Sequence, residues 1–166
     1  MNILVSWKWL GEYVDLRGLT PEDVAARVSL SGPGIEKIIP QGQELAQVVV
    51  GRILAIEPHP QADKLRIAKV DAGGKPLTIV CGGSNIAVGQ WVPVALIGAR
   101  VRWHGEGEPI ELKPIEIRGV ASEGMICAAN EIGLAEAFPH GEREILDLGL
   151  AIPGDAWTPG TPLAEA

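Results

Sequence analysis

The sequence has few aromatic residues, few cysteines and no long uninterrupted apolar run. Aromatic residues make up 4% of its 166 positions, so few rings are available to stack on nucleotide bases. Only two cysteines occur, Cys81 and Cys127, with no C-x-x-C pair and no clustered histidine. This spacing argues against a structural zinc site and favours two buried free thiols.

Proline and glycine interrupt every apolar run, so no segment reaches the length that a membrane span needs. The N-terminus has neither the basic start nor the long apolar core of a signal peptide, and we therefore expect a cytoplasmic protein with no membrane contact. Acidic residues outnumber basic ones by 21 to 14, which argues against strong unspecific binding to nucleic acid. The length of 166 residues predicts one domain, alone or with a small appendage, and the hydrophobic share of 46% indicates that it is globular.

Two short helices are predicted at the start of the chain. Ser6 can cap the first, over residues 6–14, and Thr20 followed by Pro21 begins the second, which ends at residues 31–34. Two helices of this size cannot enclose a core unaided and need a partner. The second helix is expected to bury three apolar side chains: Val24, Val28 and Leu30.

From residue 47 onward, short apolar runs alternate with turn residues. The strands expected from this pattern cover residues 48–56, 64–70, 76–81, 91–96, 110–117, 125–128 and 144–148, with one small helix over 131–137. Short strands with a single late helix favour a closed Greek-key barrel of the OB type, whereas a parallel sheet would need helices between its strands. Thr161-Pro162 resembles another helix start, and we expect the chain to be a fragment.

No pattern assembles an active site. The chain has neither a phosphate-binding loop of the G-x-x-x-x-G-K-[ST] type nor a G-x-S-x-G nucleophile elbow, and residues 82–85 are typical of a plain turn. His59 could act as a base, but no acid or nucleophile stands at a sequence spacing that would pair with it, and His104 and His140 are expected to lie in surface loops. We expect no catalytic residue, no metal ligand and no cofactor in this chain.

Binding is better supported than catalysis. Between Arg52 and Lys75 there are five basic residues and three acidic ones, a local excess of +2. Lys64 and Arg66 are predicted to share the outward face of the second strand, where OB barrels bind single strands and RNA loops. Trp103 is the one candidate for base stacking, and a role in plugging one end of the barrel explains it equally well. A solvated strand face without function explains the same charges. Three further arginines are candidates to extend the surface: Arg100, Arg102 and Arg118.

The stretch 115–128 is predicted to form a strand, a short polar turn at the barrel rim and a second strand. Gly119 and Gly124 allow the corner, and the polar residues Ser122 and Glu123 lie between them with no apolar periodicity that would bury them. Residues 118–127, RGVASEGMIC, resemble the R-G-x-x-S-x-G-M segment of the tRNA-binding OB-fold shared by several aminoacyl-tRNA synthetases and their accessory proteins.

Three more stretches carry the resemblance. Residues 59–66, HPQADKLR, are similar to the H-P-x-A-D-K-L segment of the same barrels. The other two stretches resemble the bacterial phenylalanyl-tRNA synthetase β-subunit family. They are the opening, residues 6–14, and residues 79–85 together with Gly89 and residues 92–96. Free-standing members of the barrel class lack the opening helices. Together the four stretches extend over nearly the whole chain.

The resemblance implies a five-stranded Greek-key OB-fold barrel at residues 40–151. It is inserted in a small, incomplete helical domain formed by residues 1–39 and a truncated return segment, 152–166. The family's whole enzyme is a cytoplasmic heterotetramer of two α and two β subunits that attaches phenylalanine to its tRNA with ATP and magnesium, and its aminoacylation site lies in the α subunit. The tRNA-binding positions implied here are Lys64, Arg66, Asn85, Arg118, Ser122 and Met125.

Two departures from the family pattern stand out. Residues 31–36 replace a longer apolar connection, and Gly83-Ser84 replaces Ala-Pro before Asn85, which we expect to loosen that loop. Three readings of function follow. The first is an accessory, non-catalytic tRNA-binding domain of a ligase, the second is an assembly module without RNA contact, and the third is a free-standing tRNA-binding protein, which the opening helices disfavour.

Overall fold

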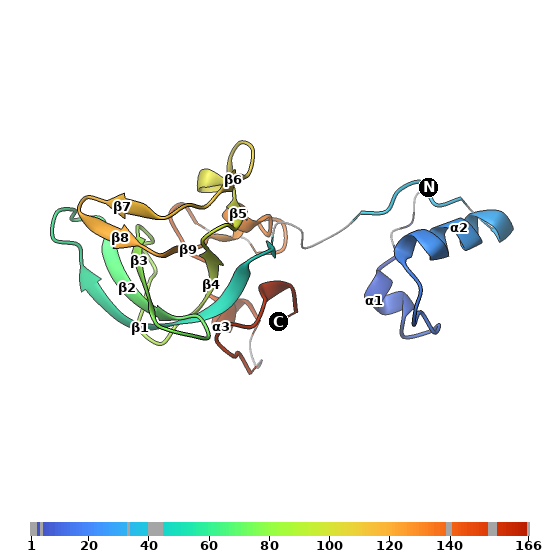
Figure 1. The fold of residues 1–166 in the computed structure, drawn as a ribbon, viewed down its shortest axis with the longest axis horizontal. Coiled ribbons are helices and arrows are strands. Elements are labelled where there is room, and N and C mark those ends of the chain that lie inside the picture. Colours follow the sequence, from blue (N-terminus) through green and yellow to red (C-terminus); the bar gives the residue numbers. More distant parts are fainter. Residues whose placement is uncertain are drawn as a thin grey trace. The chain divides into compact units, whose positions relative to one another are not determined.

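A computed structural model describes residues 3, 5–32, 34–39, 45–138, 141–152 and 156–165. Pro33 and His140, which figure in the predictions above, lie outside these ranges. The chain divides into two compact units, Met1–Gln41 and Gly42–Ala166, and each is described by itself (Figure 1). None of the helices in the described ranges has the length and apolar character needed to cross a bilayer.

The first unit contains the two predicted helices. Helix α1 spans Trp7–Leu10 and is shorter than expected, with the Ser6 hydroxyl accepting from Trp9 N at 3.4 Å. Helix α2 spans Pro21–Ser31 and begins with a capping box in which Thr20 and Asp23 bond reciprocally. No described residue of this unit is buried. The expected burial of Leu30 is therefore wrong, since that side chain is 88% exposed, while Val24 and Val28 are half-buried.

The second unit is a nearly closed, five-stranded antiparallel barrel, which confirms the predicted fold class. Its strand order is β3-β2-β1-β4-β9, and two small hairpins, β5–β6 and β7–β8, are attached to it (Figure 1). The bounds are β1 Val48–Pro58, β2 Arg66–Asp71, β3 Leu77–Cys81, β4 Trp91–Leu96, β5 Arg100–Val101, β6 Ile110–Glu111, β7 Ile115–Ile117, β8 Val120–Ser122 and β9 Gly124–Ile126. The short helical turns are η2 Trp103–Gly105, η3 Ala129–Ile132, α3 Leu148–Ala151 and η4 Leu163–Glu165.

The interior of the barrel is filled by β-branched side chains. β1 bends at a bulge between Ile53 and Ala55, and at Gly51 an added Cβ would lie 2.5 Å from a methyl group of Val94. Each fully buried valine or isoleucine contributes about 1.5–3 kcal/mol through its removal from water. The buried members of this interior cluster include Ile53, Val70, Ile79, Val92 and Val94. Val48, Val50 and Val101 belong to a second buried cluster, which also contains Leu146 and Leu148.

The barrel closes between β3 and the β8–β9 junction, largely through side chains. Val80 N donates to the Ser122 hydroxyl at 3.1 Å. Thr78 N donates to the Glu123 carboxylate at 2.8 Å, and Glu123 N returns a bond to Thr78 O at 2.8 Å. The prediction of a polar turn at Ser122 is therefore wrong: Ser122 ends β8 and is 3% exposed.

Three other predicted elements differ from the structure. In place of the expected helix over 131–137 there is the short 3-10 turn η3 at Ala129–Ile132. The expected strand over 110–117 is divided into β6 and β7, and the expected strand over 144–148 is absent, because Asp147 instead caps the short helix α3 by accepting from Leu150 N. The segment near the C-terminus lies along β1, where Gly160 N donates to Val50 O and Val50 N donates to Thr161 O, both at 2.8 Å. The return of 152–166 to a helical domain stays a prediction.

Candidate nucleic-acid interface

Two connections meet at one end of the barrel. The loop between β1 and β2, residues 59–65, and the turn between β7 and β8, residues 118–119, lie at the same end (Figure 1). The Arg118 guanidinium donates to Gln61 O at 2.9 Å, and a ring nitrogen of His59 lies 3.0 Å from Ile117 O. Segments that are 57 and 58 residues apart in the chain are thus joined by two hydrogen bonds.

Arg118 has an unusual backbone. Its φ is +47° and that of Gly119 is +83°, and positive values at both central residues define the type I′ hairpin turn. Glycine and asparagine adopt this conformation readily, whereas another L-residue pays about 1–2 kcal/mol for the left-handed geometry. The exposed Arg118 is therefore held in a turn for which arginine is a poor choice.

Lys64 and Arg66 lie at this end as well. Lys64 belongs to the turn before β2, and Arg66 is the first residue of that strand. Ala68 and Val70 are completely buried, so the two-residue period puts Arg66 on their face, and it is exposed because the strand begins there. The prediction that both cations line the outer wall is wrong, and they lie at the barrel end instead.

Asn85 is used to build the barrel. Its side-chain amide donates to Ile145 O and accepts from Ile145 N, both at 2.9 Å. Ser84 N donates to Arg143 O at 2.9 Å, so this loop has no free backbone donor at Ser84 to offer an anion. A Cβ at Gly83 would lie 2.8 Å from Ile145, so glycine is what lets the two segments approach. The expected loosening of this loop is wrong, because it is tied down on both sides.

Ser122 and Met125 are also engaged. The buried Ser122 hydroxyl accepts from Val80 N and donates to Gly124 O at 2.9 Å, and the half-buried Met125 packs against the core. Their predicted contacts with tRNA, like that of Asn85, stay predictions. The structure brings only Lys64, Arg66 and Arg118 of the six predicted positions to the barrel end as exposed cations.

Arg143 was missed by sequence reasoning. Its φ is +63° and its guanidinium donates to Gly82 O at 2.9 Å. Gly82 follows Cys81, which is the register partner of Arg66, so Arg143 lies beside the start of β2. The acidic neighbours Glu142 and Glu144 concealed it in the sequence. None of the four cations at this end forms an ion pair with another described residue, so their charges are available to a ligand. The four are Lys64, Arg66, Arg118 and Arg143.

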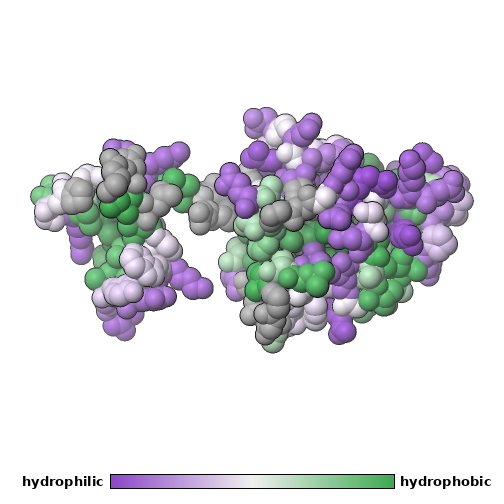
Figure 2. Space-filling model, turned by 180° about the vertical axis from the view of Figure 1, so that it is seen from behind, coloured by the Kyte–Doolittle hydropathy of each residue, from purple (hydrophilic) through white to green (hydrophobic). Residues whose placement is uncertain are grey.

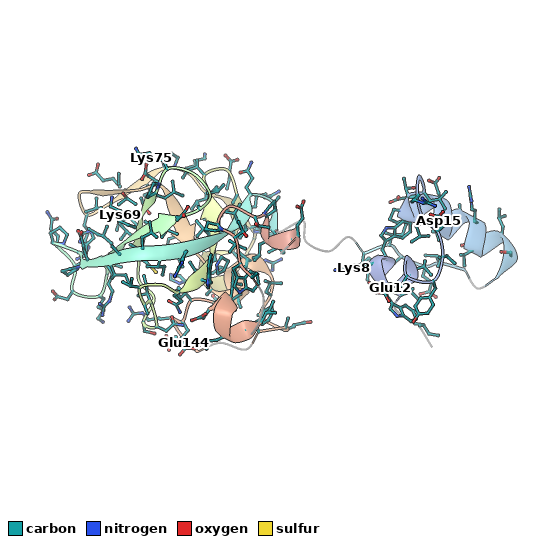
Figure 3. All side chains as sticks on the ribbon, turned by 90° about the horizontal axis from the view of Figure 1, so that it is seen from below. Lys8, Glu12, Asp15, Lys69, Lys75 and Glu144 are labelled. Carbon is teal, nitrogen blue, oxygen red and sulfur yellow. The ribbon has the colours of Figure 1, made fainter. Side chains whose placement is uncertain are left out.

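A different arrangement occurs beside the closure of the barrel. Lys69 donates to the Thr78 hydroxyl at 2.6 Å, and Figure 3 shows Lys69 and Lys75 on the opposite side of the barrel unit from Glu144. The backbone N–H of Thr78, and secondarily Lys75 and Lys69, hold the pKa of Glu123 below its usual range. Glu123 therefore stays ionised at neutral pH, and its charge attracts these two lysines.

The thiols and the remaining surface offer no comparable group. Cys81 and Cys127 are free and buried, as predicted, and burial raises the pKa of both thiols. No three His, Cys, Asp or Glu side chains gather as metal ligands within the described ranges. In Figure 2, where the end with the β7–β8 turn lies on the right, hydrophilic side chains cover its upper part.

Known proteins resemble this chain in sequence along most of its length. A family described as "Putative tRNA binding domain" matches residues 48–154, a range that contains every strand of the barrel. The phenylalanine–tRNA ligase beta subunits of Anaeromyxobacter dehalogenans and Salinibacter ruber are 42% and 40% identical over 98% and 97% of this chain. The chain spans about a fifth of their length, 18% and 19%.

Among solved structures, the MetRS related protein from Pyrococcus horikoshii is 20% identical. The match covers 75% of this chain and 97% of that one, at a TM-score of 0.47. The family match, in contrast, extends over more than half of the chain and over the whole barrel. The chain belongs to the tRNA-binding domain family.

Proposed function

We propose that this chain is an accessory, non-catalytic tRNA-binding module of a phenylalanine–tRNA ligase β subunit. The family match and the names of the relatives support this proposal. In it, attachment of phenylalanine takes place elsewhere in a cytoplasmic heterotetramer of two α and two β subunits that uses ATP and magnesium. Lys64, Arg66 and Arg118, with Arg143 beside them, contact the tRNA.

The observation that carries the proposal is the conformation of Arg118. Its left-handed backbone is costly, its side chain is exposed, and no carboxylate among the described residues pairs with it. A guanidinium held in this way presents its remaining N–H groups to phosphate oxygens, which accept them in a bidentate geometry. The cost of the conformation is consistent with a residue kept for binding.

The expected mode of binding is contact with the RNA backbone. Trp103, the predicted stacking platform, belongs to η2 beside the β5–β6 hairpin and not to this end of the barrel (Figure 1). Without an aromatic platform, cations contact phosphates and fix orientation without reading sequence. Three phosphate contacts, from Lys64, Arg66 and Arg118, give a salt slope of about −2.1 to −2.7, so affinity falls about 20- to 40-fold between 50 and 200 mM salt.

The test is tRNA binding by fluorescence anisotropy at these two salt concentrations. A triple variant changes Lys64, Arg66 and Arg118 to glutamate, and we expect it to lose binding. The matched control makes the same charge change at three exposed cations elsewhere: Arg100, Lys113 and Lys75. Equal loss in both variants would show that only net charge matters, and the proposed interface would be wrong.

An assembly role without RNA contact is the second candidate. A largely apolar hollow of about 600 Å³ lies between β3, the end of β4 and the β7–β8 hairpin, and it favours this role because exposed apolar surface often marks protein contacts. Its lining includes Leu77, Ile97, Pro114, Ile115 and Ala121. If the wild-type chain binds no tRNA at 50 mM salt, the assembly role replaces the first proposal.

A further inference from the structure

His59 joins the two cationic segments of the barrel end through one buried ring. The residue is 6% exposed. Gln61 N donates to Nδ1 at 3.1 Å, and Nε2 lies 3.0 Å from Ile117 O. A backbone N–H only donates and a carbonyl only accepts, so Nδ1 is the bare nitrogen and Nε2 carries the proton. The ring is therefore a neutral donor and acceptor between two loops.

The two hydrogen bonds of the His59 ring join it to a near and a distant part of the chain. The bond to Gln61 is local and shapes the loop that carries Lys64 and leads to Arg66. The bond to Ile117 crosses to the β7–β8 hairpin, at the residue before Arg118. In the opposite direction, the Arg118 guanidinium donates back to Gln61 O. The loop and the hairpin turn are thus connected by two bonds that run in opposite senses.

We propose that His59 is a positioning residue that holds the Arg118 turn against the Lys64–Arg66 loop and thereby sets the tRNA affinity of this end. The inference rests on the proposed function. Two surface segments that move independently must be ordered when RNA binds, and that ordering reduces affinity. The Nε2 bond to Ile117 orders the two segments before RNA binds, so less conformational entropy is lost on binding. It also stabilises a turn in which Arg118 has a strained, left-handed backbone.

Asparagine and glutamine at position 59 each keep one of the two bonds. The asparagine oxygen takes the place of Nδ1 and can accept from Gln61 N, as in an Asx turn, but it cannot reach Ile117. The glutamine amide nitrogen takes the place of Nε2 and keeps the donor to Ile117, while the local bond is lost. If His59 only shapes its own loop, His59→Asn should keep more of the tRNA affinity than His59→Gln. If His59 positions the Arg118 turn, His59→Gln should keep more of it than His59→Asn.

The experiment measures tRNA affinity at 50 mM salt and thermal unfolding for the 166-residue chain and its variants. His59→Asn is expected to weaken binding about threefold to tenfold, the range that one hydrogen bond is worth, and His59→Gln is expected to stay within about twofold. Ile79→Val, which trims a completely buried core side chain, controls for lower stability and should bind as the wild type does.

A double-mutant cycle supplies a readout that a merely structural role would not move. If His59 positions Arg118, then Arg118→Asn should cost less affinity in the His59→Asn background than in the wild type. Additive losses, or equal losses from the asparagine and glutamine variants, would overturn the inference, as would wild-type affinity in His59→Asn. In each of those cases the proposed function stands, whereas a wild type that binds no tRNA removes both.

Discussion

Replacing Arg118 with asparagine separates the stability of the β7–β8 hairpin from its proposed role in binding. Asparagine adopts the left-handed conformation readily, so the substitution relieves about 1–2 kcal/mol of backbone strain. It also removes the exposed hydrogen bond to Gln61 O, which is worth about 0.5–1 kcal/mol. The free energy of unfolding is therefore expected to stay the same or rise by up to about 1.5 kcal/mol.

The effect of the same substitution on binding has the opposite sign. One guanidinium and its phosphate contact are lost, so tRNA affinity at 50 mM salt is expected to fall about twofold to tenfold. The salt slope should become shallower by about 0.7–0.9, because one cation fewer displaces counterions. Greater stability combined with weaker binding is the pattern expected of a residue that is retained for function.

The assays are urea unfolding and anisotropy titrations over a range of salt concentrations. Arg100→Asn is the matched control, because it makes the same charge change in β5, on a different hairpin, where the guanidinium makes only a long contact of 3.4 Å to Pro109 O. It should leave the affinity within about twofold of the wild type. A variant at position 118 that is less stable by more than about 1 kcal/mol and binds normally would refute the reasoning.

Three further predictions concern the barrel around this turn. Glu123→Gln should lower the melting temperature at pH 7. This deficit should shrink as the solution is acidified, because the lowered pKa of Glu123 gives stability that is present above the ordinary carboxyl range and is lost as pH falls through that pKa; a deficit that does not change with pH would contradict this. Ser122→Ala should cost about 1–3 kcal/mol in urea unfolding, since it leaves the buried Val80 N without a partner, and tRNA affinity of the folded variant should not change. Cys81 and Cys127, whose pKa values are raised by burial, should react with a thiol reagent only on unfolding; rapid labelling of the native chain would show that the barrel opens.

Much of the barrel could be predicted from local pattern. The expected strands at 48–56, 76–81 and 91–96 agree with β1, β3 and β4 within two residues, because buried β-branched residues and flanking turn residues mark them in the sequence. The expected strand over 144–148 failed for a physical reason. Ile145 and Leu146 are buried from an irregular segment. The backbone of Ile145 bonds to the side chain of Asn85, while Leu146 N donates to Cys127 O, so apolar content did not imply a regular backbone ladder.

The candidate site was predictable in its residues but not in their roles. The resemblance indicated Arg118, Ser122 and Asn85 alike, and only Arg118 offers an exposed side chain that is not used to build the barrel. Ser122 and Asn85 bond to backbone groups 42 and 60 residues away, and no spacing rule reveals such partners. Arg143 was hidden because its place beside β2 depends on the same long-range pairing.

The segment from Arg118 to Glu123 combines two attachments that can be separated. The turn is fastened to the β1–β2 loop by the bonds of His59 and Arg118, whereas Ser122 fastens the end of β8 to β3. Roughly 10 Å of extended strand lies between the two attachments. The stability effects of Arg118→Asn and Ser122→Ala should therefore add to within about 0.5 kcal/mol in the double variant. A larger coupling energy would mean that the hairpin moves as one unit, and closure of the barrel would then itself set the position of Arg118.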